Sequence, residues 1–138
     1  MSHEKNRAEA LRWFATAEGD LATASLLKEN GRFAHACFHA HQAAGKAVKA
    51  LWCFADADPW GHSVKKVIQD LRDVDGRLYE SIASAAASGM FLDRFYIPTR
   101  YPNGLPDITP DEAFTVDDAH VCLERAREVV ETVRSVLG

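Results

Sequence analysis

Five polar side chains in the segment after Gly31 could together bind an anion. They follow the spacing i, i+4, i+7, i+11 and i+14, and they are His35, His39, Gln42, Lys46 and Lys49. At about 100° per residue, helical geometry places all five along one narrow strip. We expect either a basic, hydrogen-bonding strip that binds an anion or a partner subunit, or a solvated edge over which the lysine side chains extend.

A second group with anion-binding chemistry lies in a proline-containing stretch. Arg94 and Arg100 bracket Tyr96 and Pro98, and Tyr101 follows directly. The arginine guanidinium is a planar fork suited to phosphate or carboxylate, and tyrosine adds base stacking and a hydroxyl group. The alternative is structural: the tyrosines anchor the loop, and the arginines bond to carbonyl groups at the end of the preceding helix.

The patterns for metal or nucleotide chemistry are incomplete. His35 and His39 have the i, i+4 spacing of two ligands on one helix, but the HExxH form is absent. Zinc also needs a third protein ligand, so we expect partly exposed histidines and no metal site. The sequence has neither a glycine-rich phosphate loop nor a nucleotidyltransferase Gly-Ser motif with paired aspartates. We therefore expect no cofactor, and no nucleotide transfer by this chain alone.

Helices must position these groups. Asn30 and Gly31 end the first helix, because both residues tolerate the left-handed conformation, and Ser63 caps a later one. The expected elements are helices over residues 5–29, about 31–54, 63–74, 78–95 and 117–137, and a loop over 97–114 from which prolines exclude regular structure. No segment alternates like a strand. The predicted fold class is all-α: a four-helix up-and-down bundle with an additional short helix and one long crossover loop.

Apolar spacing predicts which helix faces are buried. In the first helix, the expected inward residues are Leu11, Phe14, Ala15, Leu21, Ala22 and Ser25. In the second helix, small residues that allow close helix packing share one face: Ala36, Ala40, Ala43, Ala47 and Ala50. This second helix is apolar around most of its circumference, so we expect it to be central. Asp20, on the first helix, is expected to form a structural ion pair across the bundle.

The composition limits the class of protein. A net charge of −4 excludes a generally basic nucleic-acid binder but allows a local basic strip. The hydrophobic content of 47% is typical of a globular protein, and we expect one domain over residues 1–138. Three cysteines without CxxC spacing predict reduced thiols and a cytoplasmic location. The sequence has no secretory h-region and no apolar run of bilayer length, so we expect no membrane association.

Two blocks of the sequence resemble the signature of the HEPN domain family. Residues 42–51 (QAAGKAVKAL) are similar to the family's usual QAAEKALKAL run, and residues 92–102 (LDRFYIPTRYP) resemble its second signature. His62 and Ser63 begin a helix as the family's histidine-led segment does. Supporting positions in the first two helices are Trp13, Ala17, Asp20, Leu21, Ala24, Leu27, Gly31, Phe33, Ala36 and Phe38.

The resemblance implies a helical bundle that often forms homodimers. Many members are similar to the substrate-binding partner of a minimal nucleotidyltransferase encoded nearby, and others are toxin-like ribonucleases with an Arg-x(4–6)-His motif at a dimer cleft. This chain departs at Gly45, where the family has glutamate; glycine costs about 1 kcal/mol of helix propensity and could permit close packing. It also lacks the ribonuclease motif in the fourth-helix region, because no histidine follows Arg94 before His120.

Arg32 and His39 do match the ribonuclease spacing, but at the start of the second helix. Acid–base cleavage of RNA requires a histidine with a pKa near neutrality and a cation that holds the phosphate. The two residues lie two helical turns apart and face the same way, so they are the catalytic candidates of this sequence. A chance match is the alternative, since the chain contains 6 histidines.

The sequence as a whole favours a nucleotide- or RNA-binding module. As the resemblance implies, it would work as a homodimer or beside a minimal nucleotidyltransferase in a toxin–antitoxin-like system, without catalytic activity alone. The expected ligand-binding residues are Gln42, Lys46, Lys49, Arg94, Tyr96, Arg100 and Tyr101. Two alternatives stay open: a metal-independent ribonuclease toxin that uses an arginine and a histidine, and a structural subunit whose polar strip makes only protein contacts.

Overall fold

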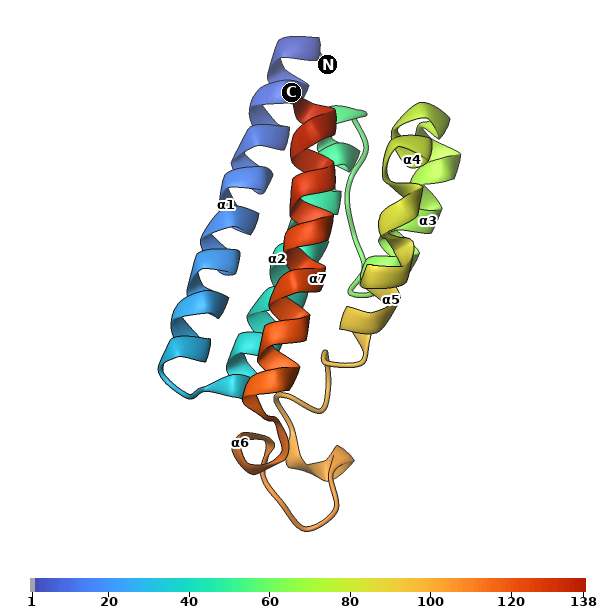
Figure 1. Cartoon of the computed structure of the whole chain (residues 1–138). Helices are drawn as coiled ribbons and strands as arrows, with labels where there is room; N and C mark the ends of the chain where they lie inside the picture. Colours follow the sequence, from blue (N-terminus) through green and yellow to red (C-terminus); the bar gives the residue numbers. More distant parts are fainter. Residues whose placement is uncertain (1) are drawn as a thin grey trace.

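The computed structural model describes residues 2–138, and its regular structure is helical throughout (Figure 1). The longer helices are α1 (His3–Glu29), α2 (Phe33–Phe54), α3 (Val64–Val74), α4 (Gly76–Ile82), α5 (Ala86–Asp93) and α7 (Val116–Leu137). The shorter segments are α6 (Pro110–Ala113) and the 3₁₀ turns Ala83–Ala85 and Pro102–Gly104. No strand occurs between residues 2 and 138, which confirms the all-α prediction. Between residues 2 and 138, none of the helices combines the length and the hydropathy that a membrane span requires.

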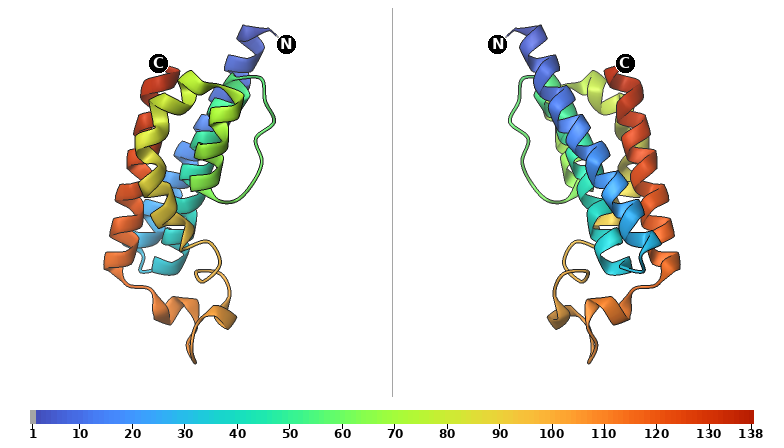
Figure 2. Two further views of the ribbon diagram at one scale, coloured as in Figure 1. Left: turned by 90° about the vertical axis from the view of Figure 1, so that its right-hand side faces the viewer. Right: turned by 90° about the vertical axis from the view of Figure 1, so that its left-hand side faces the viewer.

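The three longest helices form the frame of the molecule (Figures 1 and 2). α1 and α2 are joined by a short turn in which Gly31 has a φ of 77°, and α7 packs against both helices. On the other side of α2 and α7 lie α3, α4 and α5. The start of α1 and the end of α7 lie at the same end of the frame, where Nη1 of Arg7 donates to the backbone oxygen of Leu137 at 2.8 Å.

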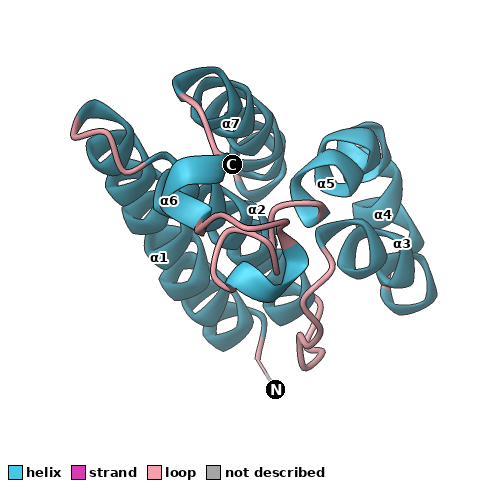
Figure 3. Cartoon of the chain, turned by 90° about the horizontal axis from the view of Figure 1, so that it is seen from below, coloured by secondary structure: helices cyan, strands magenta, loops and turns pink. Residues whose placement is uncertain are grey.

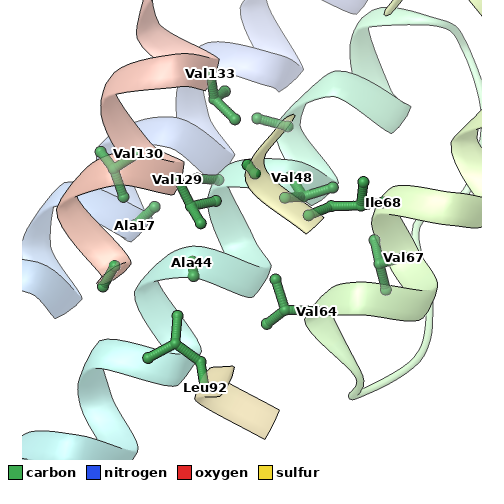
Figure 4. Close-up of a cluster of buried hydrophobic side chains, with 14 of the residues drawn as sticks. Ala17, Ala44, Val48, Val64, Val67, Ile68, Leu92, Val129, Val130 and Val133 are labelled. Carbon is green, nitrogen blue, oxygen red and sulfur yellow. The ribbon is translucent and has the colours of Figure 1, made fainter. Parts of the chain in front are cut away.

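α2 lies at the centre of the hydrophobic core, as expected. The residues of its predicted small-residue face have no exposed surface: Ala36, Ala40, Ala43, Ala47 and Ala50. Short side chains let neighbouring helices approach closely, and the larger apolar groups come from the helices around α2. Figure 4 shows Val64, Leu92 and Val129, from α3, α5 and α7, around Ala44 and Val48 of α2.

The buried face of α1 differs from the expected one. Leu11, Ala15 and Ala22 are exposed, whereas the buried apolar residues are Ala10, Phe14, Ala17 and Ala24. The reason is a second apolar stripe on the outward side of the helix, here called the outer α1 stripe: Ala8, Leu11, Ala15, Gly19, Ala22 and Leu26. Helical spacing alone could not decide which stripe packs against α2, so the expected face mixed residues of both.

The expected fourth helix, residues 78–95, is divided by the 3₁₀ turn Ala83–Ala85 into α4 and α5. After this turn, α5 lies close to the first turn of α3. A Cβ atom at Gly89 would lie 2.9 Å from Cγ1 of Val64, closer than real Cβ contacts. Tertiary packing therefore overrides the strong helix propensity of this alanine-rich stretch.

The long connection between α5 and α7 contains two helical turns that were not expected (Figure 3). We expected prolines to exclude regular structure from residues 97–114, but Pro102 and Pro110 each begin a helical segment. Proline is tolerated at the first helical position, because its missing N–H would have no partner there. The connection crosses one end of the frame, and α6 contacts α2.

Candidate functional site

A pocket between α2 and the start of α3 gathers four of the expected ligand-binding residues. Gln42, Lys46 and Lys49 line it from α2, and Tyr96 lines it from the connection after α5. The pocket, here called the α2–α3 pocket, has a volume of about 200 Å³. The other lining residues are Trp13, His41, Gly45, Gly61, His62, Ser63, Val64 and Val67.

Two lysines line this pocket, and an aspartate already pairs with one of them. Nζ of Lys46 lies 2.7 Å from Oδ2 of Asp20, which is the cross-bundle ion pair expected for that aspartate. Burial lowers the pKa of Lys49, and the nearby charge of Lys46 lowers it further. Because both effects disfavour the charged form of Lys49, an anion in the pocket would stabilise that form.

A hydrogen-bond network lies beside the pocket and joins three helices. His41 is only 1% exposed, and its Nε2 lies 2.9 Å from Oδ1 of Asp93. Ser63 donates its hydroxyl to Oδ2 of Asp93 at 2.7 Å. The backbone N–H groups of Val64 and Lys65 donate to the same carboxylate at 2.7 and 3.2 Å. Asp93 therefore holds the end of α5 against α2 and against the N-terminus of α3.

These donors keep Asp93 charged. Burial by itself raises the pKa of Asp93, but the hydrogen bonds from His41, Ser63 and the two backbone N–H groups together hold it below its ordinary value. A carboxylate at this position also interacts favourably with the dipole of α3. The second ring nitrogen of His41, Nδ1, is buried and has no hydrogen-bond partner among the described residues. His41, which lines the pocket, thus contains a buried polar atom without a partner.

Arg100 belongs to an aromatic cluster and does not line the pocket. Its guanidinium carbon lies 4.7, 4.3 and 5.0 Å from the ring centroids of Phe38, Tyr96 and Tyr101. Its Nε donates to the backbone oxygen of Tyr96 at 2.9 Å. The Tyr96 ring also stacks on His62, with centroids 5.2 Å apart and planes at 18°. Arg100 therefore holds Tyr96 in position through ring contacts and one hydrogen bond to its backbone oxygen.

Arg94 and Tyr101 also lie outside the pocket lining. The guanidinium carbon of Arg94 is 5.3 Å from the ring centroid of Phe91, within its own helical region. The Tyr101 side chain is exposed beside Arg100. The structure thus brings together the α2 candidates and Tyr96, whereas the two arginines pack against aromatic rings.

The residues with the ribonuclease spacing occupy another part of the surface. Nη2 of Arg32 lies 3.6 Å from Oδ2 of Asp111 in α6, and Nε2 of His35 lies 3.9 Å from Oδ1 of the same residue. Burial lowers the pKa of His39; the charge of Asp20 opposes this effect. Neither Arg32 nor His39 lines the α2–α3 pocket. Within residues 2–138, no group of three or more His, Cys, Asp or Glu residues could hold a metal ion.

Sequence reasoning missed the residues that complete the site: His41, His62, Ser63 and Asp93. By spacing, His41 lies off the polar strip of its helix, and its partner Asp93 comes from a distant segment. A signal was present for Asp93, because the second signature block contains it, whereas His41 lies just before the first block. Residues that recur in a signature without an evident local role are candidates for such tertiary partners.

Comparison with known proteins matches nearly the whole chain. The family model described as HEPN domain matches residues 10–136, a range that includes both signature blocks. Over 126 residues the chain is 25% identical to a protein of Methanocaldococcus jannaschii named "Putative toxin MJ1304", with 88% of this chain and 83% of that protein covered.

Three solved structures resemble this one along nearly their full length. TT1696 from Thermus thermophilus has a TM-score of 0.83 and 32% identity, over 92% of this chain and 97% of that chain. ST0689, an archaeal HEPN homologue, has a TM-score of 0.76 and 30% identity, over 94% and 98%. The HEPN domain protein tm0613 from Thermotoga maritima has a TM-score of 0.69 and 25% identity, over 91% and 97%.

Proposed function

Since this chain belongs to the HEPN domain family, we propose that it is a nucleotide- or RNA-binding module whose phosphate site is the α2–α3 pocket. The observation that carries this proposal is the convergence of Lys46 and Lys49 with Gln42 and His62 in one hollow. The lysines supply positive charge, and the amide and imidazole groups supply hydrogen bonds, a combination that suits phosphate oxygens. We propose that residues 1–138 form one domain that acts in the cytoplasm.

The charge of the molecule limits how this module binds. With a net charge of −4, the chain as a whole does not attract a polyanion over long distances. Binding must then depend on the local groups of the pocket, where Lys46 lies close enough to Lys49 to lower its pKa and where a bound anion would offset that effect. We therefore expect a short contact with one or two phosphates, and an affinity that falls only moderately as salt is raised.

Titration with AMP and with short single-stranded RNA tests the phosphate site. Lys49→Ala should weaken binding about tenfold, because it removes a hydrogen bond from a charged group worth about 1.5 kcal/mol. Lys5→Ala is the matched control: it makes the same chemical change at an exposed lysine of α1, outside the pocket lining, and should leave the affinity unchanged. Equal affinities of the two variants, or no binding by the wild type, would favour a structural interaction subunit instead.

For the partner, we propose a second copy of the chain on the outer α1 stripe. Leu26 and Leu11 of this stripe are 59% and 43% exposed, and a Cβ atom at Gly19 would meet nothing within 4 Å. Such small residues let two helices approach closely. We also propose a toxin–antitoxin-like setting, with which the name of the M. jannaschii relative is consistent. In that setting a minimal nucleotidyltransferase would be a further partner. Light scattering should give a dimer mass for the wild type and a monomer mass for Leu26→Glu. A monomeric wild type would contradict the homodimer.

One alternative has its own support: a metal-independent ribonuclease toxin that uses Arg32 and His39. The name of the M. jannaschii relative favours it, and burial leaves His39 more often neutral, the form that can accept a proton. Incubation of RNA with purified protein tests it. Cleavage by the wild type that is lost in both Arg32→Ala and His39→Ala would support the enzyme, and intact RNA at high protein concentration would exclude it.

A further inference from the structure

The loop between α2 and α3, residues 55–63, carries an exposed tryptophan beside the α2–α3 pocket. Trp60 is 83% exposed, more than any other large apolar residue among residues 2–138. Figure 2 shows this loop curving away from the helices on the same side of the molecule as the start of the connection that follows α5. The Trp60 ring is therefore available to a ligand that approaches from this side.

Trp60 borders a second hollow, here called the Trp60 hollow, with a volume of about 310 Å³. Its lining residues are Trp60, Gly61, His62, Ser63, Lys66, Val67 and Asp70. The three residues 61–63 and Val67 also line the α2–α3 pocket, so the two hollows share a wall. Trp60 lines only the hollow and Lys49 only the pocket.

The shared wall has a defined conformation. Gly61 has a φ of 110°, which side-chain-bearing residues rarely adopt, so this position of the shared wall requires glycine, and the chain bends at His62. The ring of His62 is stacked on Tyr96, which Arg100 holds in turn. Trp60 is thus attached directly to a wall that is fixed from the other side.

We propose that the two hollows form one groove for single-stranded RNA, in which a base stacks on Trp60 and the adjoining phosphate binds beside Lys49. The proposal rests on the phosphate site proposed above and adds a base subsite to it. Stacking on an aromatic ring suits any base, because every base has a π face. In a duplex both faces of a base are already stacked, so the ligand must be single-stranded.

Polar groups beside the stacking site fit the edges of a base. Nζ of Lys66 lies 3.2 Å from Oδ2 of Asp70, and both side chains line the Trp60 hollow. The ammonium group can donate to a ring nitrogen or carbonyl, and the carboxylate can accept from an exocyclic amine. An exposed pair of this kind is easily rearranged, since its own interaction contributes little free energy. The hollow therefore provides stacking and edge contacts without demanding one sequence.

Fluorescence anisotropy with three probes tests the groove: a labelled short oligoadenylate, an abasic ribose-phosphate oligomer of equal length, and a blunt RNA duplex. We expect the wild type to bind the oligoadenylate most tightly. Trp60→Ala should weaken oligoadenylate binding by about 5- to 150-fold, the range that corresponds to one stacked base. Its affinity for the abasic oligomer should not change. Trp60→Phe keeps an aromatic face and should lose less.

Lys49→Ala separates this inference from the function on which it rests. It should weaken both the oligoadenylate and the abasic oligomer, because both carry phosphates. If Trp60→Ala binds the oligoadenylate as tightly as the wild type does, the base subsite is wrong and the phosphate site stands. If the wild type binds neither single-stranded probe, the phosphate site and the groove both fail. Equal binding of the duplex would also overturn the groove, and circular dichroism verifies that the variants fold.

Discussion

The alanine side of α2 and its pocket side are stabilised by different interactions. On the alanine side, fully buried small residues such as Ala43 and Ala47 pack by close contact, without hydrogen bonds from their side chains. On the pocket side, His41 and Lys46 each contact one acid from another helix, at 2.9 and 2.7 Å. The difference implies that filled volume decides stability on the first side. On the second side, the identity of each partner decides both stability and the chemistry available to a ligand.

A cavity on the apolar side should give the largest loss of stability. Leu51 is fully buried in α2 and does not line the α2–α3 pocket. Leu51→Ala should lower the free energy of unfolding by about 2–5 kcal/mol, because it removes apolar contacts and leaves a cavity. Urea unfolding followed by circular dichroism measures this loss, and the affinity of the folded protein for AMP should not change. A loss of affinity at conditions where the variant is fully folded would show that the two sides are not independent.

On the pocket side, Asp93→Asn should give a smaller but more specific loss. The amide retains one acceptor oxygen where the carboxylate has two. Its NH₂ group would face one of two donor pairs, either His41 with the Val64 N–H or Ser63 with the Lys65 N–H. We expect a cost of about 1–3 kcal/mol in the free energy of unfolding. Asp70→Asn is the control, because the exposed pair of Asp70 with Lys66 should contribute about 0–1 kcal/mol. Equal costs for the two variants would remove the role assigned to Asp93.

The pH dependence of the Asp93→Asn effect sharpens this prediction. An aspartate in the unfolded chain has a pKa of about 3.9, and the pKa of Asp93 in the folded protein is lower. The contribution of the charged carboxylate is therefore fully present above the unfolded value and is lost as the pH falls through the folded one. Urea unfolding at a series of pH values should give a constant difference between wild type and variant near neutrality. The difference should shrink below about pH 4; a difference that grows on acidification would contradict the charged state of Asp93.

Local signals predicted the helices better than their packing. The turn at Gly31 and the cap at Ser63, whose hydroxyl accepts the N–H of Lys66, were evident from residue types. The division of the fourth helix was not evident, because the residue types of Ala83–Ala85 favour a continuous helix. The close contact between Gly89 and α3 is a tertiary feature that local signals do not show. Similarly, two apolar stripes on α1 are equivalent until α2 covers one of them.

The same distinction applies to the candidate site. Gln42, Lys46 and Lys49 lie on one helix, so their spacing alone predicted that they face a common space. Spacing could not predict whether Arg100 lines the same pocket. Its guanidinium packs against the ring of Phe38, which comes from a distant part of the sequence. Tertiary partners of this kind leave no mark in local spacing. Sequence reasoning therefore predicted the lysines of the pocket and missed His41, whose role depends on Asp93.

Gly45 lies in the pocket lining on the same helix as the alanine side, so it tests both sides at once. A Cβ atom there would lie 3.8 Å from Cγ2 of Val64, which is an ordinary contact. Close packing therefore does not require glycine at this position, in contrast to the role that the sequence suggested for Gly45. Gly45→Ala should raise the free energy of unfolding by about 1 kcal/mol, the difference in helix propensity. Gly19→Ala is the matched control, since its added methyl meets nothing within 4 Å in one chain. Because Gly19 lies in the outer α1 stripe, both variants are compared in the monomeric Leu26→Glu background, where Gly19→Ala should give a similar gain. Only Gly45→Ala should weaken AMP binding, because its methyl group enters the pocket; equal affinities of the two variants would place the phosphate away from α2.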